Sequence, residues 1–104
     1  MSDLRRNRRP TAPGTILREH YLLPRKVSVT SLAAATGLSR KHTSQIINGH
    51  KRIEPVTAAR LGLVLGTTTR FWLNLQAAVD AWDAEQEVAT WHPTISFNPP
   101  SLPS

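Results

Sequence analysis

Polar side chains able to read the edges of DNA bases gather on one side of the segment 39–48. They recur at helical spacing, which places them on a single face: Arg40, Lys41, Ser44, Gln45 and Asn48. Arginine or lysine can donate to guanine O6 and N7, and glutamine can pair with adenine through two hydrogen bonds. Thr43, Ile46 and Ile47 fall on the opposite, inward side. The segment therefore predicts a helix that contacts bases in a major groove through Arg40, Lys41, Ser44 and Gln45.

Residues that suit phosphate groups flank this predicted helix. Backbone amides at a helix N-terminus bind anions, and such a terminus is predicted near Ser28. Lys51 and Arg52 follow the base-reading segment and can place cations beside the DNA backbone. We therefore predict phosphate contacts from the amides near Ser28 and from Lys51 and Arg52. Each of these side chains alone could simply face solvent, and it is the joint arrangement that indicates a nucleic-acid surface.

Two short helices joined by a tight turn position these residues. Ser28 can cap the first helix, Gly37 can take the left-handed conformation that ends it, and Ser39 can cap the second. A turn of three or four residues that contains glycine is typical of a helix-turn-helix, although an ordinary helical hairpin is the alternative. Thr36 and Thr43 stand at inward positions, so their hydroxyls must bond to carbonyls one turn earlier. We expect these two threonines to limit stability.

Three further helices complete the predicted fold. Proline opens helices over 13–23 and 55–65, and Pro24 and Gly66 end them. Thr68 caps the longest helix, which runs to about residue 89. An apolar stripe on that helix is too rich for a lone solvent-facing helix, and although a share of it must cover the monomer's own core, it predicts the contacts of a two-fold homodimer: Trp72, Leu75, Val79 and Trp82. Asp80 and Asp83 are interpreted as its solvated side.

Charge is distributed unevenly along the 104-residue chain, whose net charge is +6. All thirteen Lys and Arg residues lie at or before Arg70, and four acids with no base follow Phe71. A positive field over the first part attracts phosphates. Residues 1–12 are predicted to be a flexible basic arm, because they have too few apolar side chains to join a core. The arm's arginines are predicted to bind phosphates or an acidic partner: Arg5, Arg6, Arg8 and Arg9.

The composition argues against several other classes of protein. The chain has no cysteine, and its four histidines lack the spacing of a helical metal site, so we expect neither a metal nor a cofactor. No paired carboxylates or glycine-rich phosphate loop indicate an enzyme. The chain has no run of eighteen apolar residues and no apolar leader near residue 1, so we expect no membrane contact and a cytoplasmic location. The proline-rich segment 90–104 predicts an irregular tail.

The segments 13–22, 32–49 and 65–83 together resemble the HigA-type antitoxins, a branch of the phage-repressor-like (XRE) helix-turn-helix superfamily. The motifs are PGTILREHYL, LAAATGLSRKHTSQIING and, most distinctively, LGTTTRFWLNLQAAVDAWD. The resemblance implies an all-α, five-helix, lambda-repressor-like DNA-binding domain over residues 13–89. It places the recognition helix at 39–47, phosphate contacts at Ser28, Asn48 and Lys51, and a dimer-forming helix at 69–88.

The resemblance also implies partners. HigA-type antitoxins are homodimers that repress their own operon at a pseudo-palindromic operator and bind a RelE-like toxin that cleaves mRNA. The chain departs from the family at Thr69 and Arg70, where Pro-Glu is frequent. Two other functions stay open on the sequence alone. One is a stand-alone helix-turn-helix repressor without a toxin partner, and the other is a module that masks another protein without binding DNA.

Overall fold

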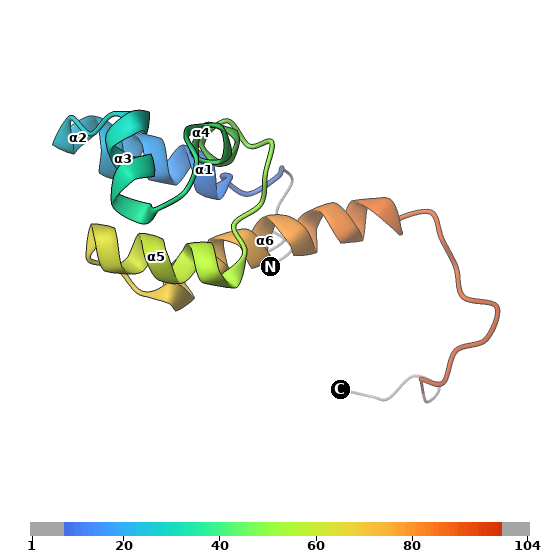
Figure 1. Ribbon diagram of the computed structural model, residues 1–104. Helices are drawn as coiled ribbons and strands as arrows, with labels where there is room; N and C mark the ends of the chain where they lie inside the picture. Colours follow the sequence, from blue (N-terminus) through green and yellow to red (C-terminus); the bar gives the residue numbers. More distant parts are fainter. Residues whose placement is uncertain (1–7, 99–104) are drawn as a thin grey trace.

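The computed structural model describes residues 8–98 (Figure 1). Within that range every regular element is helical, so the prediction of an all-α, five-helix fold is confirmed. The elements are α1 (Pro13–Ile16), η2 (Leu17–Leu22), α2 (Leu23–Arg25), α3 (Val29–Thr36), α4 (Arg40–Ile47), α5 (Pro55–Leu65) and α6 (Thr69–Glu87). The first three follow one another without a break and act as one helix. No helix of the described part is long and apolar enough to cross a membrane.

The first helical segment does not end before Pro24, as the sequence predicts, but continues to Arg25. Its middle part, η2, is wound as a π-helix, in which the N–H of Leu23 donates to the carbonyl of Arg18. A proline lacks an N–H and its ring crowds the carbonyl one turn earlier, and the wider turns accommodate both defects. Lys26 then takes a left-handed conformation (φ 56°) and ends the helix.

The predicted helix-turn-helix is confirmed in its local geometry. The Ser28 Oγ accepts a hydrogen bond from the N–H of Ser31, and the Ser39 Oγ accepts one from the N–H of His42, both at 3.0 Å. Between the two helices Gly37 has a φ of 76°, which is why glycine occupies the turn. These three residues fix the angle at which α4 leaves α3.

The two buried threonines bond backward as predicted. The Thr36 Oγ1 donates to the Leu32 carbonyl at 2.8 Å, and the Thr43 Oγ1 donates to the Ser39 carbonyl at 2.9 Å. Both side chains are almost completely buried. Their hydroxyls therefore have partners within their own helices and do not hold one helix to another.

The core is centred on Trp72, whose side chain is 0% exposed. Tyr21 and Phe71 surround its ring with tilted and edge-on aromatic contacts, and its Nε1 donates to Thr67 Oγ1 at 2.7 Å. Aliphatic side chains from the other helices complete the core: Leu17, Leu22, Leu32, Ile46, Ile47, Ile53, Ala58, Leu61 and Leu65. The helix α6 thus carries the central residue of the fold.

The burial of α6 corrects the predicted dimer contacts. Trp72 and Val79 are 0% and 2% exposed, so they pack inside the monomer and cannot touch a second copy. Leu75 and Trp82 are half-buried, and each keeps a part of its surface free. A hydrophobic stripe on the sequence does not distinguish the core from an interface, because both bury apolar surface for the same physical reason.

The C-terminal part of α6 projects from the body, and the chain continues away from it as an irregular segment (Figure 1). The prediction of an irregular tail is confirmed for residues 90–98, where no regular element occurs. Trp91 and Phe97 are 64% and 94% exposed and make no part of the core.

Candidate nucleic-acid interface

The helix α4 presents a polar face to solvent, as its sequence predicts. Arg40, Lys41 and Asn48 are exposed, Ser44 and Gln45 are half-buried, and the inward residues are buried: Thr43, Ile46 and Ile47. The structure therefore brings the four predicted base-reading side chains onto one surface. Their contacts to bases stay a prediction.

A shallow hollow of about 370 Å³ lies where the beginnings of α3 and α4 meet. Its lining residues are Val29, Arg40, Lys41 and Ser44. Val29 lies outside the set predicted from the sequence. Its only sequence signal is its position directly after the cap Ser28, which makes it the first residue of α3.

The predicted phosphate-binding residues differ in whether their side chains already have a partner in the structure. Lys51 is exposed, and so is Ser28 at the beginning of α3, although the Ser28 Oγ already accepts a hydrogen bond from the N–H of Ser31 and donates one to the Ser31 Oγ. The Asn48 Nδ2 donates a 3.3 Å hydrogen bond to Ser44 Oγ, which ties the end of α4 to its polar face. The Arg52 guanidinium is already bound to a carboxylate, that of Asp80.

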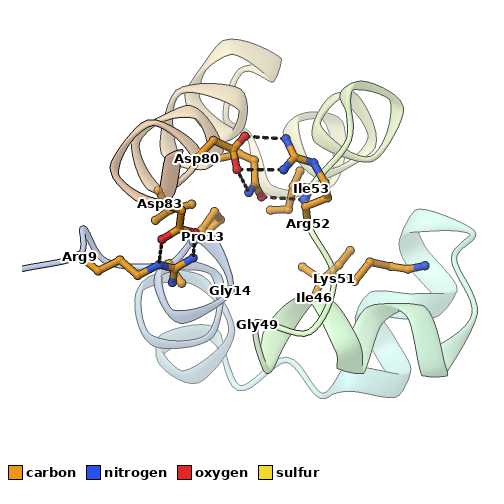
Figure 2. Close-up of a pocket in the computed structure, with 13 residues that line it drawn as sticks. Arg9, Pro13, Gly14, Ile46, Gly49, Lys51, Arg52, Ile53, Asp80 and Asp83 are labelled. Carbon is orange, nitrogen blue, oxygen red and sulfur yellow. Dashed lines mark hydrogen bonds and ion pairs between the residues drawn. The ribbon is translucent and has the colours of Figure 1, made fainter. Parts of the chain in front are cut away.

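Arg52 and Arg9 are each held by an aspartate of α6 (Figure 2). The Arg52 guanidinium donates to both carboxylate oxygens of Asp80, at 2.9 and 2.6 Å, and lies 3.2 Å from Glu54. Arg9 donates to both oxygens of Asp83, at 2.8 and 2.9 Å. In the structure both guanidiniums are therefore paired with carboxylates, so Arg9 is not part of a free arm, and the phosphate role of the half-exposed Arg52 stays a prediction. Each of these guanidiniums donates two parallel N–H hydrogen bonds to one carboxylate.

The same pairs correct the interpretation of Asp80 and Asp83 as merely solvated. The hydrogen bonds from Arg52 hold the pKa of Asp80 below its ordinary value, and the hydrogen bonds from Arg9 do the same for the pKa of Asp83. The predicted flexible arm is also shorter than residues 1–12, because Arg9 is anchored and Pro10 is buried. Arg8 is exposed, and Arg5 and Arg6 lie outside the described residues.

These contacts surround a cavity of about 200 Å³ between the start of α1, the loop after α4 and α6 (Figure 2). Gln76 of α6 closes one side of it. Its Oε1 accepts a hydrogen bond from the N–H of Ile53 at 2.8 Å, and its Nε2 donates to Asp80 at 3.0 Å. The loop that follows α4 is thus fixed to α6 through backbone and side chain. In Figure 2 Lys51 points away from this cluster, and within residues 8–98 it has no ion pair.

The first turn of α1 packs against the end of α4. Gly14 packs against the last turn of α4, and a Cβ added to it would overlap the Ile46 carbonyl oxygen and lie 2.7 Å from that of Ile47. Only a residue without a side chain permits this approach. Across the residues described, no group of three or more His, Asp or Glu side chains could hold a metal ion. The packing of α1 and of the loop after α4 thus supports the polar face of α4 from behind.

A capped helix pair, a glycine turn and a rigidly backed polar second helix define a helix-turn-helix DNA-binding protein. No protein-family model matches the chain. It is 42% identical over 83 residues to the HTH-type transcriptional regulator YbaQ of Escherichia coli K12, a match that covers 80% of this chain and 74% of that protein. It is 43% identical over 76 residues to the antitoxin HigA-1 of Vibrio cholerae, covering 73% and 71% of the two chains.

Among solved structures, the antitoxin GraA in complex with its operator has a TM-score of 0.76 and 33% identity, covering 88% of this chain and 97% of that one. The chain belongs to the HigA-type antitoxin family of the XRE-like helix-turn-helix superfamily. It is a DNA-binding antitoxin or transcriptional regulator and not an enzyme.

Proposed function

We propose that this protein is the antitoxin of a type II toxin–antitoxin module: as a homodimer it represses its own operon by sequence-specific binding, and it neutralises a RelE-like toxin. The observation that carries the DNA-binding part is the polar face of α4, which is backed by buried residues and free of large apolar side chains. Relatives named as antitoxins, some of them in complex with their operators, support the same function. A cytoplasmic location follows for a protein whose target is its own operon.

Base reading is assigned to Arg40, Lys41, Ser44 and Gln45. Arg40→Ala or Gln45→Ala should weaken operator binding by about 1–3 kcal/mol and relax the preference at one base pair. Gel-shift titrations with single base-pair substitutions in the operator measure both effects. Arg70→Ala is the charge-matched control, because Arg70 is exposed at the start of α6 and outside the α4 face. Equal losses on the operator and on random DNA would refute the assignment.

Dimerisation is assigned to the part of α6 that the monomer leaves free. Leu75 and Trp82 contribute their exposed edges, the exposed Ala78 lies one turn from both on the same side of the helix, and the exposed Ala81 lies on the adjoining side. Within the residues described, the Trp82 Nε1 is shielded from solvent and has no hydrogen-bond acceptor. That nitrogen is covered by the monomer's own residues, so the dimer contacts are assigned to the exposed edges alone.

Sedimentation equilibrium tests this interface. The unmodified chain should be a dimer at micromolar concentration, and Ala81→Glu should give a folded monomer, since glutamate favours helix but repels an apolar partner. Ala34→Glu on α3, another exposed alanine, is the control and should stay dimeric. A monomeric unmodified chain that binds a single operator half-site would rule out the dimer.

The basic residues before Arg9 are assigned to phosphates beside the operator. Arg5, Arg6 and Arg8 carry like charges, and a toxin that binds RNA through a basic surface would repel them, as the family resemblance implies. Deleting residues 2–8 should lower the log–log salt slope of operator binding by about 0.9 for each phosphate that these arginines neutralise. Toxin neutralisation should persist. An unchanged slope with lost protection of the cell would instead place the arm on the toxin.

Toxin neutralisation itself rests on family membership. Because several relatives are named as HTH-type transcriptional regulators, a stand-alone repressor without a toxin is the second candidate function. Co-expression with the small open reading frame adjacent to its gene separates the two. If expression of that open reading frame alone arrests growth and co-expression of this chain restores it, the antitoxin function is supported. Binding of the operator with no arrest under any condition supports the repressor.

A further inference from the structure

The hollow between the first turns of α3 and α4 combines one apolar side chain with three polar ones. Val29 is half-buried and packs partly against the core. Around it stand Arg40, Lys41 and Ser44 from the polar face of α4. The exposed edge of Val29 is thus an apolar spot within the surface assigned to base contacts.

We propose that this hollow is a binding subsite for the 5-methyl group of a thymine in the major groove. The proposal rests on the proposed operator binding and adds a contact to it. Among the groups that base pairs display in the major groove, hydrogen-bond donors and acceptors serve polar side chains, and the thymine methyl is the apolar group. A valine in contact with that edge has no hydrogen bond to offer and can gain only by burying such a methyl.

The local structure keeps the valine side chain in place. Val29 is the first residue of α3, directly after the cap Ser28, and a β-branched side chain in a helix has one strongly preferred rotamer. Its inner part rests on the core, so contact with DNA orders no additional side chain. The subsite is therefore rigid before DNA arrives.

The polar rim fixes where the thymine must stand. Arg40 and Lys41 occupy the first turn of α4, and Ser44 lies one turn later on the same face. A base in the hollow must therefore be next to a base pair that Arg40 or Lys41 contacts. We expect one thymine in each operator half-site at that position, and about fourfold tighter binding for each methyl group buried there.

Single-group changes in the DNA test the subsite without altering the protein. The operator is first defined by selection from random duplexes with the unmodified chain. Each thymine of a half-site is then replaced in turn by deoxyuridine, which removes only the methyl group. One replacement per half-site should weaken binding about fourfold, and the others should change it less than about twofold.

Val29→Ala supplies the protein side of the test. In this variant the critical deoxyuridine replacement should have no further effect, because the valine that contacts the methyl is gone. Val56→Ala is the matched control, since Val56 is 66% exposed on α5 and outside the α4 face, and it should keep the fourfold loss. Circular dichroism checks that each variant is folded.

If Val29→Ala binds too weakly to measure, Val29→Ser repeats the comparison with a side chain that has no methyl group. Tolerance of deoxyuridine at every thymine would overturn the subsite. So would an equal loss in the unmodified chain and the Val29 variant. Failure of the unmodified chain to select any sequence would instead refute the proposed operator binding itself.

Discussion

Gly14→Ala tests whether the close approach of α1 to α4 supports the recognition helix. The added methyl group would overlap the Ile46 carbonyl oxygen and stand 2.7 Å from the Ile47 carbonyl oxygen. A comfortable carbon–oxygen contact is about 3.3 Å or longer, so one helix must move by more than about 0.6 Å. Both neighbours are backbone atoms at the end of a helix, and no side chain can rotate away to relieve the contact.

Two opposing effects decide the sign of this substitution. Alanine is favoured over glycine in a helix interior by about 1 kcal/mol, and by less in the first turn, where Gly14 lies. Overpacking a close contact costs about 1–3 kcal/mol, with the upper end expected where backbone must shift. The overlap therefore wins, and we expect the free energy of unfolding to fall by about 2 kcal/mol.

Urea unfolding followed by circular dichroism measures the change. With a slope near 1 kcal/mol per molar urea, the midpoint should fall by about 2 M. Thr15→Ala is the control, because Thr15 is the next residue of α1 and is half-buried. This substitution should change the free energy of unfolding little or not at all. Operator affinity should fall in Gly14→Ala but not in Thr15→Ala. A Gly14→Ala protein as stable as the unmodified one would show that helix propensity outweighs the contact, and would refute the reasoning.

Three further substitutions have defined outcomes. Asp80→Asn should lower stability at neutral pH by about 0.5–1 kcal/mol, since the pair with Arg52 is half-exposed. The pKa of Asp80 is lowered on folding, so its contribution to the free energy of unfolding is present above the ordinary aspartate pKa and is lost as the pH falls through the lowered value. When the pH is lowered from neutral, the variant should therefore lose less stability than the unmodified chain. Identical pH profiles of acid unfolding would contradict the assignment. Thr43→Val should raise the free energy of unfolding by about 0.5–1 kcal/mol, because the carbonyl that the Thr43 hydroxyl contacts already accepts a helical N–H. If urea titration instead showed the free energy of unfolding to fall by more than about 1 kcal/mol, the hydroxyl would have a larger role. Gln76→Leu should cost about 1–3 kcal/mol by leaving the buried N–H of Ile53 without an acceptor, and a thermal unfolding curve unchanged from the unmodified chain would reject this.

Local patterns in the sequence were sufficient to predict the helices and the face assigned to DNA. Caps and stops act within one turn of the chain, so Ser28, Gly37, Ser39 and Gly66 mark helix ends whatever lies around them. The polar face of α4 also follows from spacing alone, since a helix fixes which residues share a side. Local winding was less predictable at Pro24, because the chain absorbed the proline by widening its turns instead of ending the helix.

Packing in three dimensions was needed to show which charged and apolar residues are committed within the monomer. Arg9 and Asp83 are 74 positions apart, and Arg52 and Asp80 are 28 apart, so no local pattern pairs them. Trp72 and Trp82 look alike in a helical stripe, yet the first is the centre of the core and the second is only half-buried and outside it. Periodicity shows that a helix has an apolar side, but which element covers each turn of that side depends on how the helices pack against one another.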